Sequence, residues 1–371
     1  MTQNEFLELC ADGNYSEVCE AIDSGVDPNE PGEINGNAMT PIFVASSSGN
    51  KDAVRALAER GVNCSEGFIA ATVSMKIDVV ELLVSLGADI NEPDSYGHTA
   101  LLSAVMMNRP DIAEDLIDLG ADVNLKADGR NNALTYAAMM ACSDRLGGKA
   151  EKVSPFLVGL LVEKGAEYFD AVTIAIKAGN AKFAEYIFLA GADPNIKDEE
   201  GRTLVMYSVM SGGGILRTLL EYGADPNTPD NNGRFPLIVA AIDDEAEKTM
   251  IETLLEFGAE INARDKKGLT ALMWASAGMD RGAGMLLPVL IRTGGFRAEG
   301  WKLWSAFTAL YAAAKRESHL ETIRLLIKEG ADVNIIDKRG MNALMYALAN
   351  GDDDIADILA EAGATINFDM T

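Results

Sequence analysis

The chain has 371 residues, of which 48% are hydrophobic and 24% are charged. This balance is typical of a chain that folds around a packed core, so extended disorder is excluded. Aspartate and glutamate outnumber lysine and arginine by 57 to 31, which gives a formal net charge of -26. Such a charge repels nucleic-acid phosphates and anionic lipids, so we expect no nucleic-acid partner and no membrane-surface partner.

The N-terminal end carries much of the excess acid and shows no targeting signal. Residues 1–125 contain 22 acidic and 5 basic side chains. The first 25 residues contain no lysine, no arginine and no apolar run typical of a secretory signal, and no apolar run long enough for a transmembrane helix occurs in the chain. We expect a cytoplasmic protein, and delivery into a host cell stays an open alternative. The spacing of Cys10, Cys19, Cys64 and Cys142 fits neither a disulfide framework nor a zinc site.

A short glycine-centred motif recurs along the whole chain. It reads GVD at its first occurrence and GAD at several later ones, with degenerate copies between them. The spacing averages about 34 residues, and a period of this length indicates stacked structural repeats. About eleven predicted repeats end near the following glycines: Gly25, Gly61, Gly87, Gly120, Gly165, Gly191, Gly223, Gly258, Gly294, Gly330 and Gly363.

A second motif, Thr-Pro-Leu or a variant of it, opens an apolar segment between successive glycine markers. Threonine before proline or alanine is typical of a helix N-cap, and the marker glycine suits the left-handed conformation that ends a helix. Each repeat is therefore predicted to hold two short antiparallel helices, and neighbouring repeats must stack to bury their apolar faces. The copies begin at Thr40, Thr99, Asn132, Thr203, Phe235, Thr270, Thr308 and Asn342.

Together the two motifs resemble the ankyrin repeat, whose pattern is D-x-x-G-x-T-P-L-H-x-A-A-x-x-G, then an apolar helix, then L-L-x-x-G-A-D-x-N. The best matches are Asp198 to Asn227 and Asp265 to Leu272, and the resemblance extends from Phe6 to Asn367. It implies an all-α fold with β-hairpin fingers: an ankyrin-repeat α-solenoid that forms a single elongated, curved domain over residues 1–371. The histidine of the family pattern is absent from every copy, so the inter-repeat hydrogen bonds of that side chain are not expected.

Two repeats are shorter than the rest. The intervals 61–87 and 165–191 each advance by only 26 residues and lack most of the D-x-x-G-x-T segment. Since that segment forms the β-hairpin finger in the family, we expect no finger at the start of either repeat.

Two other places depart from the pattern, one by its length and one by its residue types. The interval from Gly120 to Gly165 is 45 residues long, and its excess predicts an extended loop at Cys142–Pro155. After Gly294 the polar finger residues are replaced by large aromatic ones. These residues form either a local mini-core, which we favour because tryptophans are mostly buried, or an exposed partner site. They are Phe296, Trp301 and Trp304.

No motif in the chain indicates catalysis. The two histidines, His98 and His319, have no partner in sequence, and the phosphate-loop, zinc-protease and nucleophile-elbow motifs are absent. The triple glycine at 212–214 lacks the lysine and the preceding strand that a phosphate loop requires. We therefore expect no enzyme activity, no cofactor and no metal site.

The resemblance implies that a partner protein binds in the concave groove, which is lined by the first helix of each repeat and by the finger tips. The exposed positions of the first helices are rich in methionine and aromatic residues, which adapt readily to a partner. Each of these side chains could instead belong to the core between repeats. The expected contact residues on the helices are Met106, Met107, Tyr136, Met139, Met140, Tyr207, Met210, Trp274 and Tyr346.

The predicted finger tips change from acidic to basic toward the C-terminus, and such a gradient would orient a polar partner. The expected contact residues at the tips are Arg202, Arg234, Lys266, Lys267, Lys338 and Arg339. We predict a non-catalytic protein-interaction module of unknown partner and oligomeric state. Three alternatives stay open: an inhibitor that occludes an enzyme's active site or imitates an anionic ligand, a passive or self-assembling scaffold, and, least favoured, an enzyme with an unrecognised site.

Overall fold

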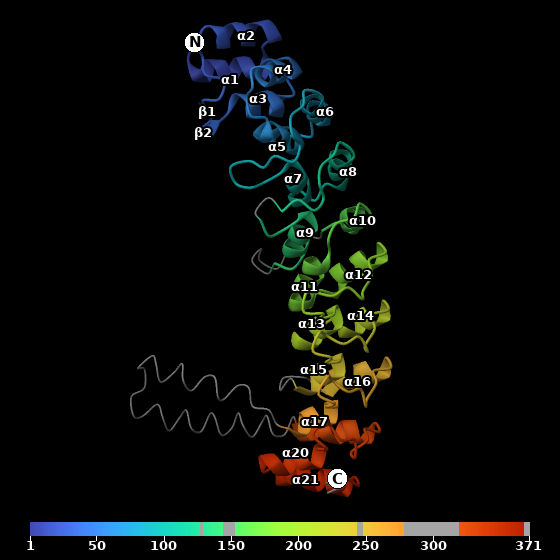
Figure 1. The fold of residues 1–371 in the computed structure, drawn as a ribbon. Helices are drawn as coiled ribbons and strands as arrows, with labels where there is room; N and C mark the ends of the chain where they lie inside the picture. Colours follow the sequence, from blue (N-terminus) through green and yellow to red (C-terminus); the bar gives the residue numbers. More distant parts are fainter. Residues whose placement is uncertain (127–128, 144–152, 243–247, 278–318, 367–371) are drawn as a thin grey trace, which may run out of the picture. The chain divides into compact units, whose positions relative to one another are not determined.

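The fold is taken from a computed structural model that describes residues 1–126, 129–143, 153–242, 248–277 and 319–366. Helices make up nearly all of its regular structure, which confirms the predicted all-α ankyrin-repeat class. The chain divides into two compact units, Met1–Ala192 (unit 1) and Asp193–Thr371 (unit 2), each of which is a stack of helix pairs (Figure 1). A single elongated, curved domain stays a prediction.

The described part of unit 1 contains six helix pairs. The first helices pack on one another in the order α1, α3, α5, α7, α9, α11, and the second helices pack in the order α2, α4, α6, α8, α10, α12. Their bounds are α1 Gln3–Asp12, α2 Tyr15–Asp23, α3 Pro41–Ser48, α4 Lys51–Glu59, α5 Ser65–Val73, α6 Ile77–Ser85, α7 Ala100–Met106, α8 Pro110–Asp118, α9 Ala133–Ala141, α10 Pro155–Glu163, α11 Phe169–Ala178 and α12 Ala181–Leu189.

Unit 2 repeats the same arrangement. The first helices α13, α15, α17 and α20 pack in that order, α14 packs on α16, and α20 packs on α21. Residues 319–328 form a further helix. The bounds are α13 Leu204–Met210, α14 Leu216–Glu221, α15 Pro236–Ile242, α16 Lys248–Glu256, α17 Ala271–Ser276, α20 Ala343–Asn350 and α21 Asp353–Glu361.

The predicted helix ends are present among the described residues, except that the Thr40 side chain makes no capping hydrogen bond to α3. The side chains of Thr99, Thr203 and Thr270 each accept a hydrogen bond from the backbone N–H three residues further on, and those of Asn132 and Asn342 do the same. Every marker glycine among the described residues has a φ between 76° and 107°, a conformation that glycine adopts without steric cost. Local sequence therefore sets the length of each helix.

The two short repeats lack a finger, as predicted. Helix α5 begins at Ser65 and helix α11 at Phe169, directly after the loops that follow Gly61 and Gly165. The finger of the second repeat, in contrast, is a regular hairpin, in which β1 (Gly32–Ile34) pairs antiparallel with β2 (Asn37–Met39). Each missing finger leaves its neighbours without the contact that adjacent fingers otherwise make.

Asparagine side chains join successive repeats. In the marker G-A-D-x-N, the Asn227 amide donates to the carbonyl oxygen of Gly258 at 2.9 Å and accepts from the Glu260 N–H at 2.7 Å. The equivalent residues Asn91, Asn124, Asn195 and Asn334 make the same pair of bonds to their next repeats. These bonds couple repeats in the absence of the family's histidine.

In unit 2 the repeat of Gly330 lies directly on the repeat of Gly258. Asn262 accepts a hydrogen bond from the Asp332 N–H at 3.0 Å. The finger that follows Gly330 likewise contacts the finger that follows Gly258, because the Lys338 N–H donates to the Lys267 carbonyl oxygen at 3.2 Å. The marker spacing instead predicts a repeat between these two, ending near Gly294. Gly294 lies outside the described residues, as do Thr308, Phe296, Trp301, Trp304 and positions 144–152 of the predicted Cys142–Pro155 loop.

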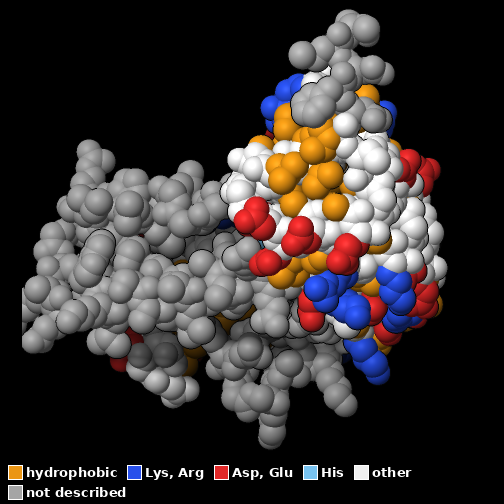
Figure 2. Space-filling model, turned by 90° about the horizontal axis from the view of Figure 1, so that it is seen from below, with side chains coloured by type: hydrophobic (Ala, Val, Ile, Leu, Met, Phe, Trp, Pro, Cys, Tyr) orange, Lys and Arg blue, Asp and Glu red, His pale blue; other side chains and the backbone are white. Residues whose placement is uncertain are grey.

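The end of unit 2 carries both polar and apolar surface. On the face shown in Figure 2, an apolar patch lies beside a row of acidic side chains, and basic side chains are grouped below that row. The acidic first turn of the last helix, with Asp353 and Asp354, is exposed, whereas Leu348 and Ile366 are 47% and 39% exposed. The terminal repeat is therefore only partly polar.

Candidate functional site

An aspartate organises each regular finger of unit 2. The Oδ1 atom of Asp230 accepts the backbone N–H groups two and four residues further on, at 2.8 and 2.9 Å. Asp265 and Asp337 make the same two bonds at the same distances. Because these turn amides have no other partner in the finger, the carboxylate holds the finger in one conformation. The aspartate of the D-x-x-G-x-T motif thus fixes the conformation of the finger.

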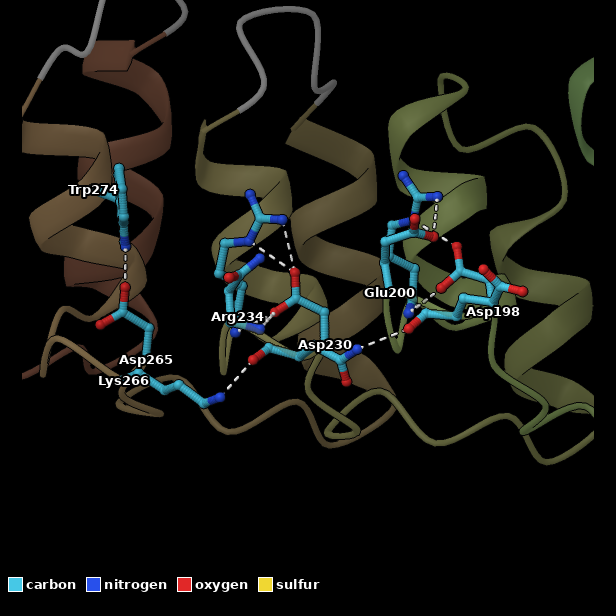
Figure 3. A network of polar contacts seen from close by, with 11 residues as sticks. Asp198, Glu200, Asp230, Arg234, Asp265, Lys266 and Trp274 are labelled. Carbon is cyan, nitrogen blue, oxygen red and sulfur yellow. Dashed lines mark hydrogen bonds and ion pairs between the residues drawn. The ribbon is translucent and has the colours of Figure 1, made fainter.

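The second carboxylate oxygen reaches an aromatic side chain on the following helix. Asp198 Oδ2 accepts from the Tyr207 hydroxyl at 2.9 Å, Asp265 Oδ2 from Trp274 Nε1 at 3.1 Å, and Asp337 Oδ2 from the Tyr346 hydroxyl at 2.8 Å. In all three pairs the aromatic residue lies nine positions after the aspartate. Three of the four aromatic contact residues predicted from the sequence are therefore tied to their own fingers (Figure 3, which labels Asp265 and Trp274).

A basic side chain covers each of these rings. The Arg202 guanidinium carbon lies 5.1 Å from the centre of the Tyr207 ring, Lys267 Nζ lies 5.9 Å from that of Trp274, and the Arg339 guanidinium carbon lies 5.5 Å from that of Tyr346. These distances are within the range of cation–π attraction. We call the three groups the finger clusters: Asp198 with Arg202 and Tyr207, Asp265 with Lys267 and Trp274, and Asp337 with Arg339 and Tyr346.

The repeat of Asp230 has no aromatic residue in this position. Val239 lies nine residues after Asp230, and Arg234 occupies the free carboxylate oxygen instead, with Nε at 2.8 Å and Nη2 at 2.7 Å. Figure 3 shows this pair between the other two fingers. Val239, Arg234, Met206 and Met210 line a hollow of about 220 Å³.

Neighbouring fingers of unit 2 approach so closely that only glycine fits between them. The Asn231 N–H donates to the Glu200 carbonyl oxygen at 3.0 Å, and Lys266 Nζ donates to the Asn231 carbonyl oxygen (Figure 3). A Cβ atom on Gly201 would lie 2.9 Å from the Asn231 nitrogen. The φ of Gly201 is also +75°. The glycine of the D-x-x-G motif is therefore needed both for the close contact with the next finger and for this left-handed conformation.

A basic groove lies between the fingers of Asp265 and Asp337. It has a volume of about 500 Å³ and is lined by Lys266, Lys267, Lys338 and Arg339 together with Trp274 and Tyr346. Within the described residues, neither Lys267 nor Lys338 forms an ion pair. Four cations thus line this groove, and Asp337 is the one acidic residue among the described residues that line it.

The burial of the aromatic residues differs from the expectation for exposed contact positions. Trp274 is 6% and Tyr346 is 9% exposed, because each is held by its finger aspartate and covered by a cation. Tyr207 and Tyr136 are half-buried. The rings of Trp274 and Tyr346 therefore expose little surface.

The methionine residues are the more accessible part of the predicted surface. In unit 1, Met106 and Met139 are 44% and 43% exposed at the ends of α7 and α9, while Met107 and Met140 are half-buried. In unit 2, Met210 is 50% exposed at the end of α13. Each of the two units thus carries exposed methionine on its first helices.

The described residues contain no group of three or more His, Cys, Asp and Glu side chains that could hold a metal ion. Burial raises the pKa of the Cys10 thiol to about 12 and that of the Cys64 thiol to about 11, so both stay protonated near neutral pH. His98 lies 3.7 Å from Asp94 within one finger and stacks on Tyr96. No helix of the described residues is both long enough and apolar enough to span a membrane.

Comparison with known proteins returned one family. The model "Ankyrin repeats (3 copies)" matches residues 7–94, 67–127, 139–230, 172–265, 205–294 and 286–369. The matches overlap and extend over most of the chain. The comparison with curated proteins gave no match.

Proposed function

Because the chain belongs to the ankyrin-repeat family, whose members are generally protein–protein interaction modules, we propose that it binds another protein and performs no chemistry of its own. The contact surface that we propose is the concave groove side, formed by the first helices and the fingers. It includes the finger clusters of unit 2 and the exposed methionines of both units.

The observation that carries this proposal is the repetition of the finger cluster. Three fingers of unit 2 each hold an aromatic ring on the finger aspartate and place a cation over that ring. The repeat of Asp230 folds with a valine in place of the ring, which supports the view that the rings serve another purpose. Side chains already held in place lose less conformational entropy when a partner binds.

The charge of the basic groove indicates the charge of the partner surface that it binds. Lys267 and Lys338 lie in a chain of net charge -26 and have no ion-pair partner among the described residues. An acidic partner surface would supply the missing counter-charges, while the ring edges of Trp274 and Tyr346 would contact its apolar atoms. Such charges mainly increase the association rate and fix the orientation of the partner.

We place this binding in the cytoplasm. None of the four cysteines, all of which lie in the described residues, forms a disulfide, and two of them are buried as thiols. Reduced cysteines of this kind are typical of a reducing compartment.

Reversing the charge of the basic groove tests the proposal. The full chain is used to capture its partner from extract of the native cells, and the affinity of the purified partner is then measured for Lys267→Glu with Lys338→Glu. We expect a loss of at least about tenfold, or roughly 1.4 kcal/mol, because two attractive contacts become repulsive. The matched control carries the same charge change on the second helices, Lys182→Glu with Lys248→Glu. Equal affinities for the two double variants would contradict the proposed surface.

A further inference from the structure

The gap left by the missing finger of the α5 and α6 repeat forms a groove. It has a volume of about 370 Å³, within the range of about 300–1,000 Å³ that is usual for binding pockets. The finger of the preceding repeat lines one side through Met39, and the finger of the following repeat lines the other through Ser95 and Tyr96. Phe43 of α3 and Ile69 of α5 line it from the helices. We propose that this groove, the finger gap, binds a protruding hairpin loop of a partner protein, with an apolar residue and basic residues near the turn.

A backbone donor in the finger gap is left without its regular acceptor. In unit 2, two of the three residues that follow a finger aspartate and have a preceding finger donate their N–H to that finger, Asn231 to Glu200 and Lys338 to Lys267, while Lys266 reaches it through its side chain. Ser95 occupies this position after Asp94, and the repeat before it has no finger. Within the described residues the Ser95 N–H donates no hydrogen bond. A carbonyl oxygen of an inserted loop would satisfy it, as the carbonyl of a preceding finger does elsewhere.

The finger gap also offers apolar surface. Phe43, Ile69 and Met39 are only half-buried. Tyr96 is 83% exposed, the largest exposed fraction among the large hydrophobic side chains of the described residues. An apolar residue at the tip of a loop would cover this surface, and the Tyr96 ring could close over it.

The charge around the gap selects a basic loop. Glu66 and Asp94 line the groove, and among the described residues the Glu66 carboxylate accepts one hydrogen bond, from the neutral Thr40 hydroxyl at 2.6 Å. Residues 1–125 as a whole carry 22 acidic side chains against 5 basic ones. Lysine or arginine beside the turn of the loop would pair with Glu66, whereas an acidic loop would be repelled.

A randomised library of disulfide-closed hairpin loops, selected for binding to the full chain, tests this inference. We expect the enriched loops to carry lysine or arginine next to an apolar residue. Their affinity should fall at least tenfold for Glu66→Lys with Ile69→Arg, because the pairing charge is reversed and the apolar surface is removed. Glu252→Lys, a charge reversal of the same sign on the exposed side of α16, should leave it unchanged.

Two variants of Ser95 isolate the backbone donor. Ser95 is the second residue of a turn closed by the bond from the Gly97 N–H to the Asp94 carbonyl oxygen, 3.0 Å long, a position that accepts proline. Ser95→Pro removes the N–H while keeping the turn, and it should lower the affinity of the chain for the selected loops at least fivefold. Ser95→Ala keeps the N–H and should have no effect.

The inference would be overturned by any of three results: no loop is enriched, the enriched loops are acidic, or they bind the Glu66→Lys, Ile69→Arg variant or the Ser95→Pro variant as tightly as the unmodified chain. Because the finger gap lies in unit 1, the Lys267→Glu, Lys338→Glu variant should bind the loops normally. This separates the result from that of the proposed function.

Discussion

Replacing Phe68 by alanine is expected to lower the free energy of unfolding by about 3–5 kcal/mol, the range measured for large buried aromatic side chains. Phe68 lies in α5 and is 1% exposed. The loss has two parts, the transfer of the ring to water and the cavity that stays behind. The second part should be large here, because a Cβ on the adjacent Gly67 would already lie 2.9 Å from the Ile42 side chain, so α3 and α5 have no room to close further.

The repeat of Phe68 also has fewer other contacts that could compensate for the lost packing. It lacks a finger, so the packing of α5 on α3 and α7 is its main link to the neighbouring repeats. In a stacked array, stability depends on each interface between adjacent repeats. Phe156→Ala is the matched control, since Phe156 on α10 is 61% exposed. Urea unfolding of the full chain, followed by circular dichroism, gives both values, and similar losses for the two variants would contradict the packing described for α5.

Replacing Asp337 by alanine is expected to cost about 2–4 kcal/mol. Its side chain is 1% exposed, and it accepts hydrogen bonds from the N–H groups of Arg339 and Met341 and from the Tyr346 hydroxyl. Alanine would leave these three donors without an acceptor, and each buried donor left unpaired costs roughly 1–3 kcal/mol, reduced where water can reach it. The control Asp357→Ala, on the exposed face of α21, should stay within about 0.5 kcal/mol of the unmodified chain.

The effect of Asp337 should depend on pH. Burial raises the pKa of this carboxyl, but the hydrogen bonds from the Met341 N–H, the Tyr346 hydroxyl and Arg339 outweigh burial and hold the pKa below its usual value. The carboxylate therefore stabilises the fold above the unfolded pKa of about 3.9, and this contribution is lost as the pH falls through the lower folded pKa. The difference in unfolding free energy between the unmodified chain and Asp337→Asn should be larger at pH 7 than at pH 3. A difference that grows toward low pH would show that the carboxyl is not held as its ion.

The repeat pattern of the sequence was sufficient to predict the helices and the missing fingers. N-caps such as Thr203 and the marker glycines act within their own repeat, so their effect can be predicted without knowing which repeats touch. The same holds for the short intervals after Gly61 and Gly165, because a finger that has no residues cannot form.

The sequence pattern does not predict which repeats contact each other. Counting markers predicts a repeat between those of Gly258 and Gly330, yet the bond between Asn262 and Asp332 joins these two directly. A local motif states how a repeat folds but not which repeat it stacks on. Only the three-dimensional structure shows that residues so far apart in sequence are neighbours.

The finger clusters were only half predicted. The aromatic residues and the tip cations were identified as separate sets, and the sequence gives no direct measure of burial, so Trp274 and Tyr346 were expected to be exposed. The missing part was the aspartate that joins them. Its signal is present in the chain as a fixed spacing of nine residues between the finger aspartate and the aromatic residue, at Asp198, Asp265 and Asp337.

Site-specific photo-crosslinking in extract of the native cells tests the proposed binding surface most directly. A photoreactive phenylalanine derivative replaces Met139 or Met210, the exposed methionines of α9 and α13, and in the control replaces Leu189, which is 71% exposed on the second helix α12. The account predicts a discrete crosslinked protein from Met139 and Met210 and none from Leu189. A crosslink from Leu189 alone, or equal crosslinks from all three positions, would contradict it.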